Sequence, residues 1–290
     1  MKKETLQKRL QIANDIMYYI YTHIDTNIDI DELSINLNVS KFHMHRIFKE
    51  VFLRNIYESI KSIRLQKASN LLLTNKYSTI TEIANMCGYS SQTSFIRVFK
   101  ERFNMTPKDW KKGGYKKYSQ KILEQSPKAM QSTAAFEHIE PTIVKMPIFK
   151  AYYIRHHGYN TTIKQTWQKL QTWIFHNEIS NFKQIALFHD NPAITPLDEC
   201  EYVACVVSDE KDIKSDRLPK FSISDGVYAR FDLYGMHGDL LKLIHWVYHE
   251  WLPKSEYETT TKPSYAIYKK NSYLSEDNEL DVSFYLSIRF

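Results

Sequence analysis

The chain has few residues that cross-link or interrupt a backbone. Its 290 residues include 3 cysteines, 7 glycines and 9 prolines. Three cysteines without a Cys-x-x-Cys pair are too few for a disulfide framework, so we expect them to be reduced. Long apolar runs are also missing, and the basic start MKKETLQKRL is not followed by an apolar stretch. We therefore expect no membrane span and no signal peptide, and a cytoplasmic location.

Motifs of catalysis and metal binding are missing as well. The sequence has neither a phosphate-binding loop nor the G-x-S-x-G motif of hydrolases. His245 and His249 lie four residues apart, but their sequence HWVYHE lacks the Glu between the two histidines that a zinc protease needs. We expect Cys87 to be a small buried residue rather than a redox centre. These observations predict a protein that is not an enzyme and that needs no cofactor or metal.

Acidic charge is scarce in the N-terminal part. Residues 1–120 contain 20 Lys and Arg against 11 Asp and Glu, whereas residues 121–290 contain 19 against 22. The length and the 43% hydrophobic content favour two domains with cores of their own. A basic N-terminal domain indicates a polyanion partner, although a merely solvated basic surface would give the same count.

Two stretches of the basic part resemble each other. Ile30–Phe52 reads IDELSINLNVSKFHMHRIFKEVF, and Ile80–Phe103 reads ITEIANMCGYSSQTSFIRVFKERF. Each predicts a short helix, a tight turn at Asn38 or Gly88, and a longer helix, which is the helix-turn-helix pattern. The run Asn55–Thr74 between them has an apolar stripe and no Gly or Pro, so we expect one long connecting helix.

Residues that cap helices precede each predicted helix. We expect Asp31 and Thr81 to cap the short helices of the two copies. Ser40 in the first copy, and Ser90 or Ser91 in the second, are expected to cap the longer helices.

The longer helix of each copy has one apolar and one polar face. Phe95, Phe99 and Phe103 form a stripe that we expect to be buried, together with Val98. A polar face on one helix is usually only solvated, but two copies with the same arrangement favour a reading surface for DNA, because Arg and Gln can bond base edges and helix N-termini can bond phosphates. Two such helices about 34 Å apart would enter successive major grooves. The predicted DNA-binding residues are Ser40, Lys41, Phe42, His45, Arg46, Lys49, Ser91, Gln92, Thr93, Ile96, Arg97 and Lys100.

The C-terminal part is duplicated too. Lys150–Ile174 and Gly226–Leu252 each contain a strand rich in Tyr or Phe, a Gly-containing turn and a helix with two Trp residues. Two strand-like runs follow each copy, QIALFHD and YVACVVSD after the first, and SYAIYKK and DVSFYLSIRF after the second. The pattern predicts a tandem β-α-β-β domain of the α+β class with pseudo-two-fold symmetry.

The domain boundaries follow from these repeats. We expect an all-α DNA-binding domain over 1–112, a linker over 113–133 and an α+β domain over 134–290. The linker is predicted from its Gly pair, its lysines and its Ser and Gln content. The predicted fold class is therefore multidomain, with a double helix-turn-helix unit followed by the tandem β-α-β-β unit.

A known family shares the run ANMCGYSSQTSFIRVFKERFNMTPKDWKK, from Ala84 to Lys112. It resembles the AraC/XylS family signature almost position for position, and the resemblance covers roughly 10–112. Asn104 stands where the family usually has Gly. The resemblance implies a pair of homeodomain-like helix-turn-helix units in a sequence-specific transcription regulator, which bends DNA and often contacts RNA polymerase. It implies base-reading roles for Phe42, His45 and Arg46 in the first copy and for Gln92, Thr93 and Arg97 in the second.

The second domain resembles the GyrI-like effector-binding domain over about 136–290. HHGY (156–159), FHDNPAITPLDECEYVACV (188–206) and PSYAIY (263–268) carry the resemblance, in an order of domains similar to the Rob type of regulator. It implies a groove that binds small, often cationic aromatic molecules. Relatives commonly have Glu at the groove floor where this chain has Ala266, and often an acidic residue at Val203. The predicted ligand-binding residues are Tyr153, Trp167, Glu201, Tyr228, Trp246 and Tyr265.

Three functions follow, of which the first is favoured. It is a DNA-binding regulator, expected to be an activator, whose partners are double-stranded promoter DNA, RNA polymerase and a small amphipathic or aromatic effector. In the second, the C-terminal domain recruits a protein instead of a metabolite. In the third, the C-terminal domain is a small-molecule hydrolase. The operator, the effector and the oligomeric state stay open.

Overall fold

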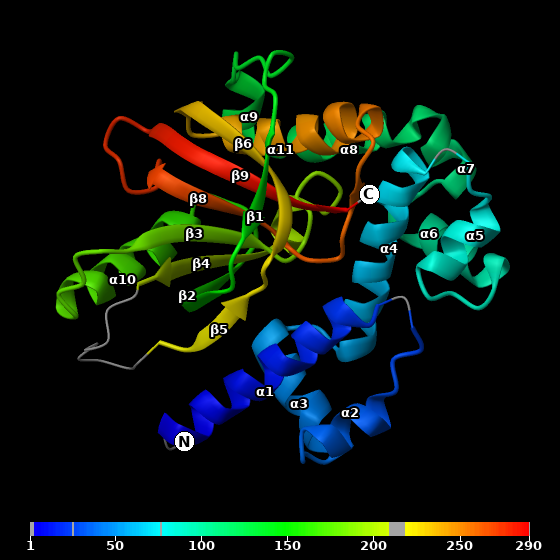
Figure 1. Cartoon of the computed structure of the whole chain (residues 1–290), viewed down its shortest axis with the longest axis horizontal. Coiled ribbons are helices and arrows are strands. Elements are labelled where there is room, and N and C mark those ends of the chain that lie inside the picture. The colour runs from blue at the N-terminus through cyan, green and yellow to red at the C-terminus, as the bar shows by residue number, and fades with distance from the viewer. Residues whose placement is uncertain (1–2, 25, 76, 209–217, 290) are drawn as a thin grey trace. The chain divides into compact units, whose positions relative to one another are not determined.

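Helices make up the described part of the N-terminal unit, Met1–Lys112, whereas the C-terminal unit, Gly113–Phe290, combines helices with a sheet (Figure 1). The computed structural model describes residues 3–24, 26–75, 77–208 and 218–289. Within these ranges no helix is both long and apolar enough to cross a bilayer.

The N-terminal unit contains the two predicted helix-turn-helix copies. Its helices are α1 (Lys3–Thr22), α2 (Ile30–Asn36), α3 (Lys41–Phe52), α4 (Ile56–Thr74), α5 (Ile80–Met86), α6 (Gln92–Phe103) and α7 (Pro107–Asp109), and a π-helical turn η1 (Trp110–Gly114) follows. The first copy is α2 with α3, and the second copy is α5 with α6. The predicted connecting helix is confirmed as α4, which Asn55 caps.

The N-caps of the short helices were predicted two residues too far along the chain. Asp29 caps α2 by accepting bonds from the backbone N–H groups of Asp31 and Glu32. Thr79 caps α5 through a reciprocal pair of bonds with Glu82. A capping side chain must lie just before the first helical turn, and Asp31 and Thr81 are already inside it.

The N-caps of the longer helices were predicted correctly. The hydroxyl of Ser40 accepts a bond from the backbone N–H of His43 at the start of α3. The hydroxyl of Ser91 accepts one from Ser94 at the start of α6. Both turns contain the expected left-handed residue, Asn38 with φ 51° and Gly88 with φ 74°.

Each copy has an aromatic core. In the first copy Met44, Phe48 and Phe52 of α3 are buried together with apolar residues of α1, α2 and α4. In the second copy Phe95, Phe99 and Phe103 of the predicted stripe are buried, whereas Val98, also expected to be buried, is half-buried. Trp110 closes this second core, because its ring lies 4.6 Å from that of Phe103 and its Nε1 donates to the carbonyl of Ser69.

Nine strands in the described part of the C-terminal unit form one antiparallel sheet. Its path is β1-β6-β9-β8-β3-β4-β2-β5, and β7 pairs with β9 outside this path. The strands are β1 (Thr142–Met146), β2 (Phe149–His157), β3 (Lys183–Phe188), β4 (Glu201–Val207), β5 (Lys220–Ile223), β6 (Gly226–Met236), β7 (Glu258–Thr259), β8 (Ser264–Lys270) and β9 (Glu279–Arg289). The helical segments are α8 (Tyr115–Leu123), α9 (Pro127–Gln131), α10 (Ile163–His176), α11 (Asp239–Trp246), η2 (Leu197–Glu199), η3 (Val247–Trp251) and η4 (Leu252–Lys254).

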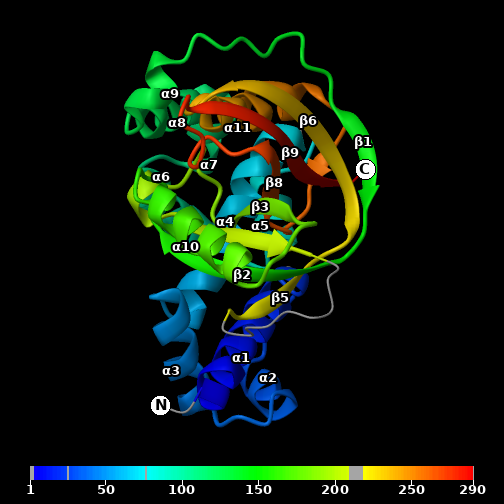
Figure 2. The ribbon, with the colours of Figure 1, turned by 90° about the vertical axis from the view of Figure 1, so that its left-hand side faces the viewer.

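The sheet has the predicted pseudo-two-fold symmetry. Its first β-α-β-β unit is β2-α10-β3-β4, and its second is β6-α11-β8-β9. The two units join where β3 pairs with β8, and each outer strand has its counterpart on the other side of that junction. α10 lies against β2 and β4, as Figure 2 shows, and α11 lies against β6 and β9 in the same way.

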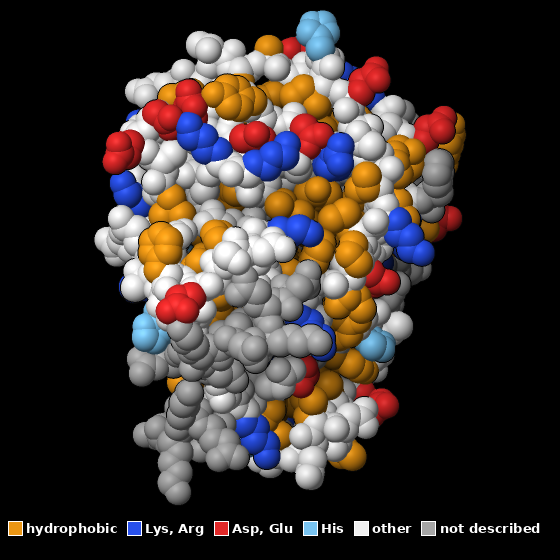
Figure 3. All heavy atoms as spheres, turned by 60° about the vertical axis from the view of Figure 1, so that its left-hand side comes forward, with side chains coloured by type: hydrophobic (Ala, Val, Ile, Leu, Met, Phe, Trp, Pro, Cys, Tyr) orange, Lys and Arg blue, Asp and Glu red, His pale blue; other side chains and the backbone are white. Residues whose placement is uncertain are grey.

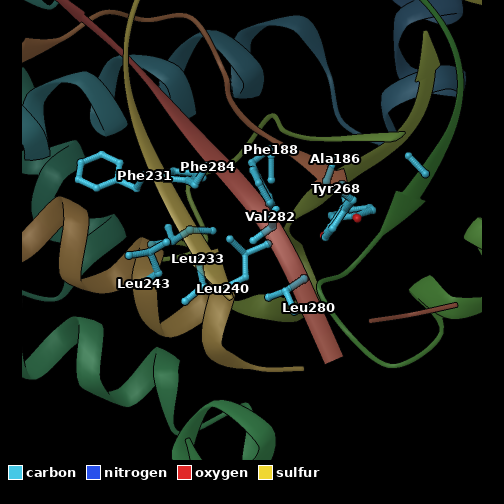
Figure 4. Packing of buried hydrophobic residues seen from close by; sticks show 14 of the residues in the cluster. Ala186, Phe188, Phe231, Leu233, Leu240, Leu243, Tyr268, Leu280, Val282 and Phe284 are labelled. Carbon is cyan, nitrogen blue, oxygen red and sulfur yellow. The ribbon is translucent and has the colours of Figure 1, made fainter. Parts of the chain in front are cut away.

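Both faces of this sheet are apolar at the centre. On one face the strands pack against α10 and α11, where Leu240 and Leu243 of α11 meet Leu233 and Val282 (Figure 4). We call this set the helix-side cluster. On the other face lies a second set with Phe149, Ala151, Tyr153, Ile185, Leu187, Val203, Cys205, Ile223, Tyr228, Tyr265 and Tyr285. We call it the far-side cluster.

The segment predicted as a linker, 113–133, contains α8 and α9. Apolar side chains of these helices, including Ile122 and Ala129, pack with Leu197 and Leu241 of the C-terminal unit. The composition of the segment is mostly polar. Its few apolar residues are spaced so that they share one side of each helix, and these apolar sides cover part of the domain.

Several surface charges of the C-terminal unit are paired with opposite charges. Lys270 lies 2.5 Å from both Asp277 and Glu279, and Arg289 bonds Glu258. Figure 3 shows acidic and basic side chains next to one another on one face, beside a region in which hydrophobic side chains gather. A surface of mixed sign does not attract polyanions as the basic N-terminal sequence does.

Candidate nucleic-acid interface and ligand face

The predicted reading surface of the first copy lies on the exposed side of α3. Lys41, Phe42, Arg46 and Lys49 are exposed, and His45 is half-buried. Phe42 is 78% exposed, although it belongs to a helix whose other side is core. A large apolar ring held in water on a basic surface is available to contact an apolar group such as a thymine methyl.

Local contacts restrain several of these side chains. Lys41 donates to Asp31 over 3.1 Å, and this hydrogen bond raises the pKa of the Lys41 ammonium. Arg46 lies 2.9 Å from the Nδ1 of His43, and the ring of His45 stacks on Tyr57 at 5.6 Å. Side chains that are already ordered lose less conformational entropy when they bind.

The predicted reading surface of the second copy lies on α6. Gln92, Thr93, Arg97 and Lys100 are exposed, and Ile96 is half-buried. They lie on the side opposite the buried phenylalanine stripe, as the sequence predicts. Ser40 and Ser91, the caps of the two helices, are exposed as well, so both helix N-termini are accessible to solvent.

Gln92 has a partner in the preceding helix. Its Oε1 accepts a hydrogen bond of 3.0 Å from the hydroxyl of Thr81 in α5. The bond fixes the amide so that the Nε2 group points away from Thr81 as a donor. An adenine edge needs one donor and one acceptor from the same amide, so Gln92 would exchange or share its bond to Thr81 on binding.

The six predicted ligand-binding residues do not share one surface. Trp167 and Trp246 pack in the helix-side cluster. Tyr153, Tyr228 and Tyr265 belong to the far-side cluster. A single small molecule could not contact both sets, because the sheet separates them.

The helix-side cluster contains a polar network among its aromatic rings. The indole Nε1 of Trp167 donates to the hydroxyl of Tyr202 over 2.9 Å. Burial raises the pKa of the Tyr202 and Tyr268 hydroxyls well above the ordinary value. Neutral hydroxyls buried among apolar rings can bond an uncharged polar ligand.

Ala266 belongs to the same side. It is fully buried, pairs with Ala186 and Phe284 on the neighbouring strands, and faces α10 and α11. Val203 faces the opposite way, in the far-side cluster. Acidic residues at these two positions would therefore lie on different faces, and only one at 266 would lie between the sheet and the helices.

The far-side cluster is lined by stacked tyrosines. The rings of Tyr265 and Tyr285 are parallel at 4.8 Å, and Tyr228 meets Tyr265 edge-on at 5.1 Å. The hydroxyl of Tyr228 donates to the carbonyl of Ser224, and burial raises the pKa of Tyr228 to about 12. Arg155 lies 5.0 Å above the ring of Tyr153.

Glu201 is engaged within the domain. Its side chain is buried, and Oε1 lies 2.8 Å from the Nδ1 of His157. Its backbone N–H donates to Asp190. A carboxylate already paired with an imidazole is a weak anchor for a cationic ligand, because the ligand would have to displace that partner.

A buried cluster of three residues was not predicted. The hydroxyl of Ser119 in α8 lies 2.7 Å from Nδ1 of His245 and 3.0 Å from Nδ1 of His249. Burial lowers the pKa of both imidazoles to about 3. A hydroxyl has one proton, so Ser119 donates to one ring and accepts from the other. The helical spacing of the two histidines was visible in the sequence, but Ser119 is 126 residues from His245 and 130 from His249.

No group of three or more potential metal ligands occurs among the residues that the structure describes. His245 and His249 bond a serine instead, and the buried residues Cys87, Cys200 and Cys205 form no disulfide.

Comparisons with known proteins match both units. Residues 139–289, just over half of the chain, match the GyrI-like small molecule binding domain, and residues 33–113 match a helix-turn-helix domain. The probable transcription factor PqrA of Proteus vulgaris is 36% identical over 105 residues, which cover 36% of this chain and 85% of PqrA.

Two further relatives come from Escherichia coli. The regulatory protein SoxS is 34% identical over 101 residues, which cover 35% of this chain and 94% of SoxS. The xylose operon regulatory protein is 35% identical over 95 residues, which cover 33% of this chain and 24% of that protein. The chain therefore belongs to the AraC/XylS family of DNA-binding transcription regulators and has a GyrI-like small molecule binding domain after its helix-turn-helix units.

Proposed function

We propose that the chain activates transcription by reading a two-part DNA site with α3 and α6, under the control of a small molecule bound to the C-terminal unit. The observation that carries this proposal is the repeated geometry of the two helices. α3 buries Met44, Phe48 and Phe52 and exposes Phe42, Arg46 and Lys49 on the opposite side. α6 buries Phe95, Phe99 and Phe103 and exposes Gln92, Arg97 and Lys100.

The roles of individual residues follow from their chemistry. We assign base contacts to Phe42, His45 and Arg46 in one groove and to Gln92, Thr93, Ile96 and Arg97 in the next. Arg97 can bond guanine bidentately, and Phe42 can cover a thymine methyl. Lys41, Lys49 and Lys100 are assigned to phosphates, as are the backbone N–H groups at the helix N-termini behind Ser40 and Ser91.

The effector is proposed to bind on the helix side of the sheet. Position 266, where relatives have the groove carboxylate, faces α10 and α11 in this fold. With Ala266 there, and with Glu201 paired to His157, the site favours an uncharged aromatic or amphipathic molecule over a cation. Trp167 and Trp246 would contact it, whereas Tyr153, Tyr228 and Tyr265 would not.

The remaining parts of the proposal concern the setting. A chain that binds promoters as an activator would contact RNA polymerase and act in the cytoplasm, where bacterial DNA is found. We propose a regulatory rather than a catalytic role, since the relatives that cover the helix-turn-helix unit are regulators. The match to a small molecule binding domain favours a metabolite over a protein partner for the C-terminal unit.

The test of the DNA assignment is a selection of random duplexes by the purified full chain, with and without cell extract. We expect a two-part consensus, and a log K that falls with log salt by about 0.9 for each phosphate contact. A selection that enriches no sequence under either condition would refute the assignment.

The effector assignment has a separate test. Thermal unfolding of the full chain is followed against a library of uncharged and cationic aromatic compounds, with the variants Trp167→Leu and Tyr228→Leu as a matched pair. A stabilising compound whose effect is lost in Trp167→Leu alone is the expected result. Loss in Tyr228→Leu alone would move the site to the far side of the sheet.

A further inference from the structure

Arg64 of α4 contacts both helix-turn-helix copies. Its Nε donates to the carbonyl of Ile24 over 3.1 Å, and its Nη2 donates to the carbonyl of Thr26 over 2.9 Å. Both carbonyls belong to the segment between α1 and α2. Ile24 is itself buried in the core of the first copy, so the guanidinium is bonded to backbone that the first copy holds in place.

The other side of the same guanidinium touches the second copy. Its Cζ lies 5.8 Å from the ring centre of Tyr89, which follows the turn of that copy. The ring of Tyr89 lies 5.3 Å from that of Phe95, a fully buried residue of α6. Arg64 is therefore linked through Tyr89 and Phe95 to the helix that we assign to the second groove.

The turn of the second copy is closely packed at this point. A Cβ atom placed on Gly88 would lie 2.7 Å from Nη2 of Arg64 and 2.8 Å from the carbonyl oxygen of Ile24. The backbone of one copy thus approaches the backbone of the other without room for a methyl group. Burial lowers the pKa of the Arg64 guanidinium, as expected for a charge removed from water.

We propose that Arg64 is a positioning residue that fixes the distance and angle between α3 and α6, and so determines which half-site spacing the protein accepts. This inference rests on the proposed function, in which both helices read DNA. Each added base pair moves a half-site by about 3.4 Å and rotates it around the DNA axis. A hydrogen bond to a base tolerates a change of only a few tenths of an ångström in its donor–acceptor distance.

Arg suits this position better than Lys. The planar guanidinium donates in two directions with fixed geometry and still presents a flat face to a ring. A Lys ammonium carries its three donors on a single nitrogen atom, so it lacks the fixed fork of the guanidinium, and it has no flat face. Arg64→Lys keeps the charge and removes the fork, whereas Arg64→Met removes both.

Lys61, one turn earlier on α4, is the matched control. It forms an ion pair of 2.9 Å with Glu101 of α6, and both side chains are exposed. It is a long basic side chain on the same helix that reaches the second copy. Lys61→Met therefore removes a contact between α4 and α6 and leaves the bonds of Arg64 to Ile24 and Thr26 in place.

The experiment uses the full chain and the two-part site obtained by selection. Affinity is measured on duplexes whose half-sites are moved together or apart by one, two and three base pairs, for the wild type and for Arg64→Met, Arg64→Lys and Lys61→Met. We expect the wild type and Lys61→Met to prefer one spacing by about tenfold or more, the cost of losing one to two base contacts. In both Arg64 variants the preference should fall to about threefold or less, because the two helices no longer hold one separation.

The outcomes separate the inference from the proposed function. If the Arg64 variants keep the wild-type preference, the inference is overturned while DNA binding stands. If the wild type enriches no two-part site, the proposed function fails, and the inference fails with it. Circular dichroism and thermal unfolding accompany each variant; should Arg64→Met not fold, the spacing profile of Arg64→Lys decides in the same way.

Discussion

The first and the second helix-turn-helix copy bury the same stripe but use different residues where the backbone bends. The left-handed turn residue is Asn38 in the first copy and Gly88 in the second. After the longer helix the left-handed residue is Leu53 in the first copy and Asn104 in the second. The short helix is capped by Asp29 alone in the first copy and by a reciprocal Thr79–Glu82 pair in the second.

These differences show which constraint acts at each position. A left-handed residue is required in both turns, and Asn satisfies it where there is space for a side chain. Gly88 meets a second requirement, since Arg64 and Ile24 occupy the place of its Cβ atom. The turn of the second copy therefore tolerates fewer residue types than the turn of the first. It is also the place where the two copies meet.

Substitution of the turn residues should give the largest difference in stability between the two copies. Gly88→Ala introduces a methyl group at φ 74° against Arg64 and Ile24. We expect a loss of about 3 kcal/mol, from the left-handed backbone and from the overpacking together. Asn38→Ala, at φ 51°, should cost only about 1 kcal/mol. Urea unfolding of both variants measures the difference, and equal losses would mean that the approach at Gly88 is not a constraint.

The two basic residues on the exposed side of α6 should affect binding differently. Arg97→Ala is expected to weaken binding to the selected site by about 1–3 kcal/mol and to relax the preference at one base pair. Lys100→Ala should weaken binding evenly on all sequences and reduce the salt slope by about one. Fluorescence anisotropy at several salt concentrations distinguishes them. The assignment of Arg97 to a base would be wrong if its variant behaved like that of Lys100.

The end of α3 offers a stabilising change. Leu53 is 67% exposed and has a left-handed backbone with φ 57°. Asn at this position, as in the second copy, should stabilise the fold by about 0.5–1 kcal/mol, because Asn tolerates this conformation better than Leu. Asn104→Leu should destabilise by a similar amount. Opposite signs in thermal unfolding are expected, and the same sign for both would contradict the equivalence of the two positions.

A small pH effect should distinguish the caps. The backbone N–H and the hydroxyl of Thr79 both donate to Glu82, and these bonds lower the pKa of the Glu82 carboxyl. A carboxyl with a lower pKa in the folded state stabilises the fold above its unfolded pKa and loses this contribution as pH falls. The difference in melting temperature between the wild type and Glu82→Gln should shrink from pH 6 to pH 4.

The control for this effect is Thr79→Ser, which keeps the hydroxyl and should follow the wild type at every pH. A difference between the wild type and Glu82→Gln that does not change with pH would show that the carboxylate is not the stabilising form.

Periodicity predicted the helical unit well. The apolar spacing in both copies predicted the buried side of α3 and α6. The repeat predicted six strands of the sheet in their order, but β1, β5 and β7 lie outside the repeated runs and were not predicted. The caps of α2 and α5 were missed by two residues because Asp29 and Asp31, like Thr79 and Thr81, are all good capping residues. Only the first hydrogen-bonded turn decides between them.

The ligand face was harder to predict for a different reason. β4 is buried on both sides, so the alternation of polar and apolar residues that marks one face is missing. The same holds in β2, where the neighbours Tyr152 and Tyr153 are both buried and lie on opposite faces of the sheet. The contacts of Arg64 and of Ser119 join residues far apart in the chain, and no local sequence pattern predicts them.

The account rests on two reading surfaces carried by one chain. Its most direct test is DNA selection with the wild type, Arg46→Ala and Arg97→Ala in parallel. The account predicts two enriched blocks whose centres lie about one helical turn apart, of which Arg46→Ala alters only one and Arg97→Ala only the other. A single enriched block, or two blocks that change together in both variants, would contradict it.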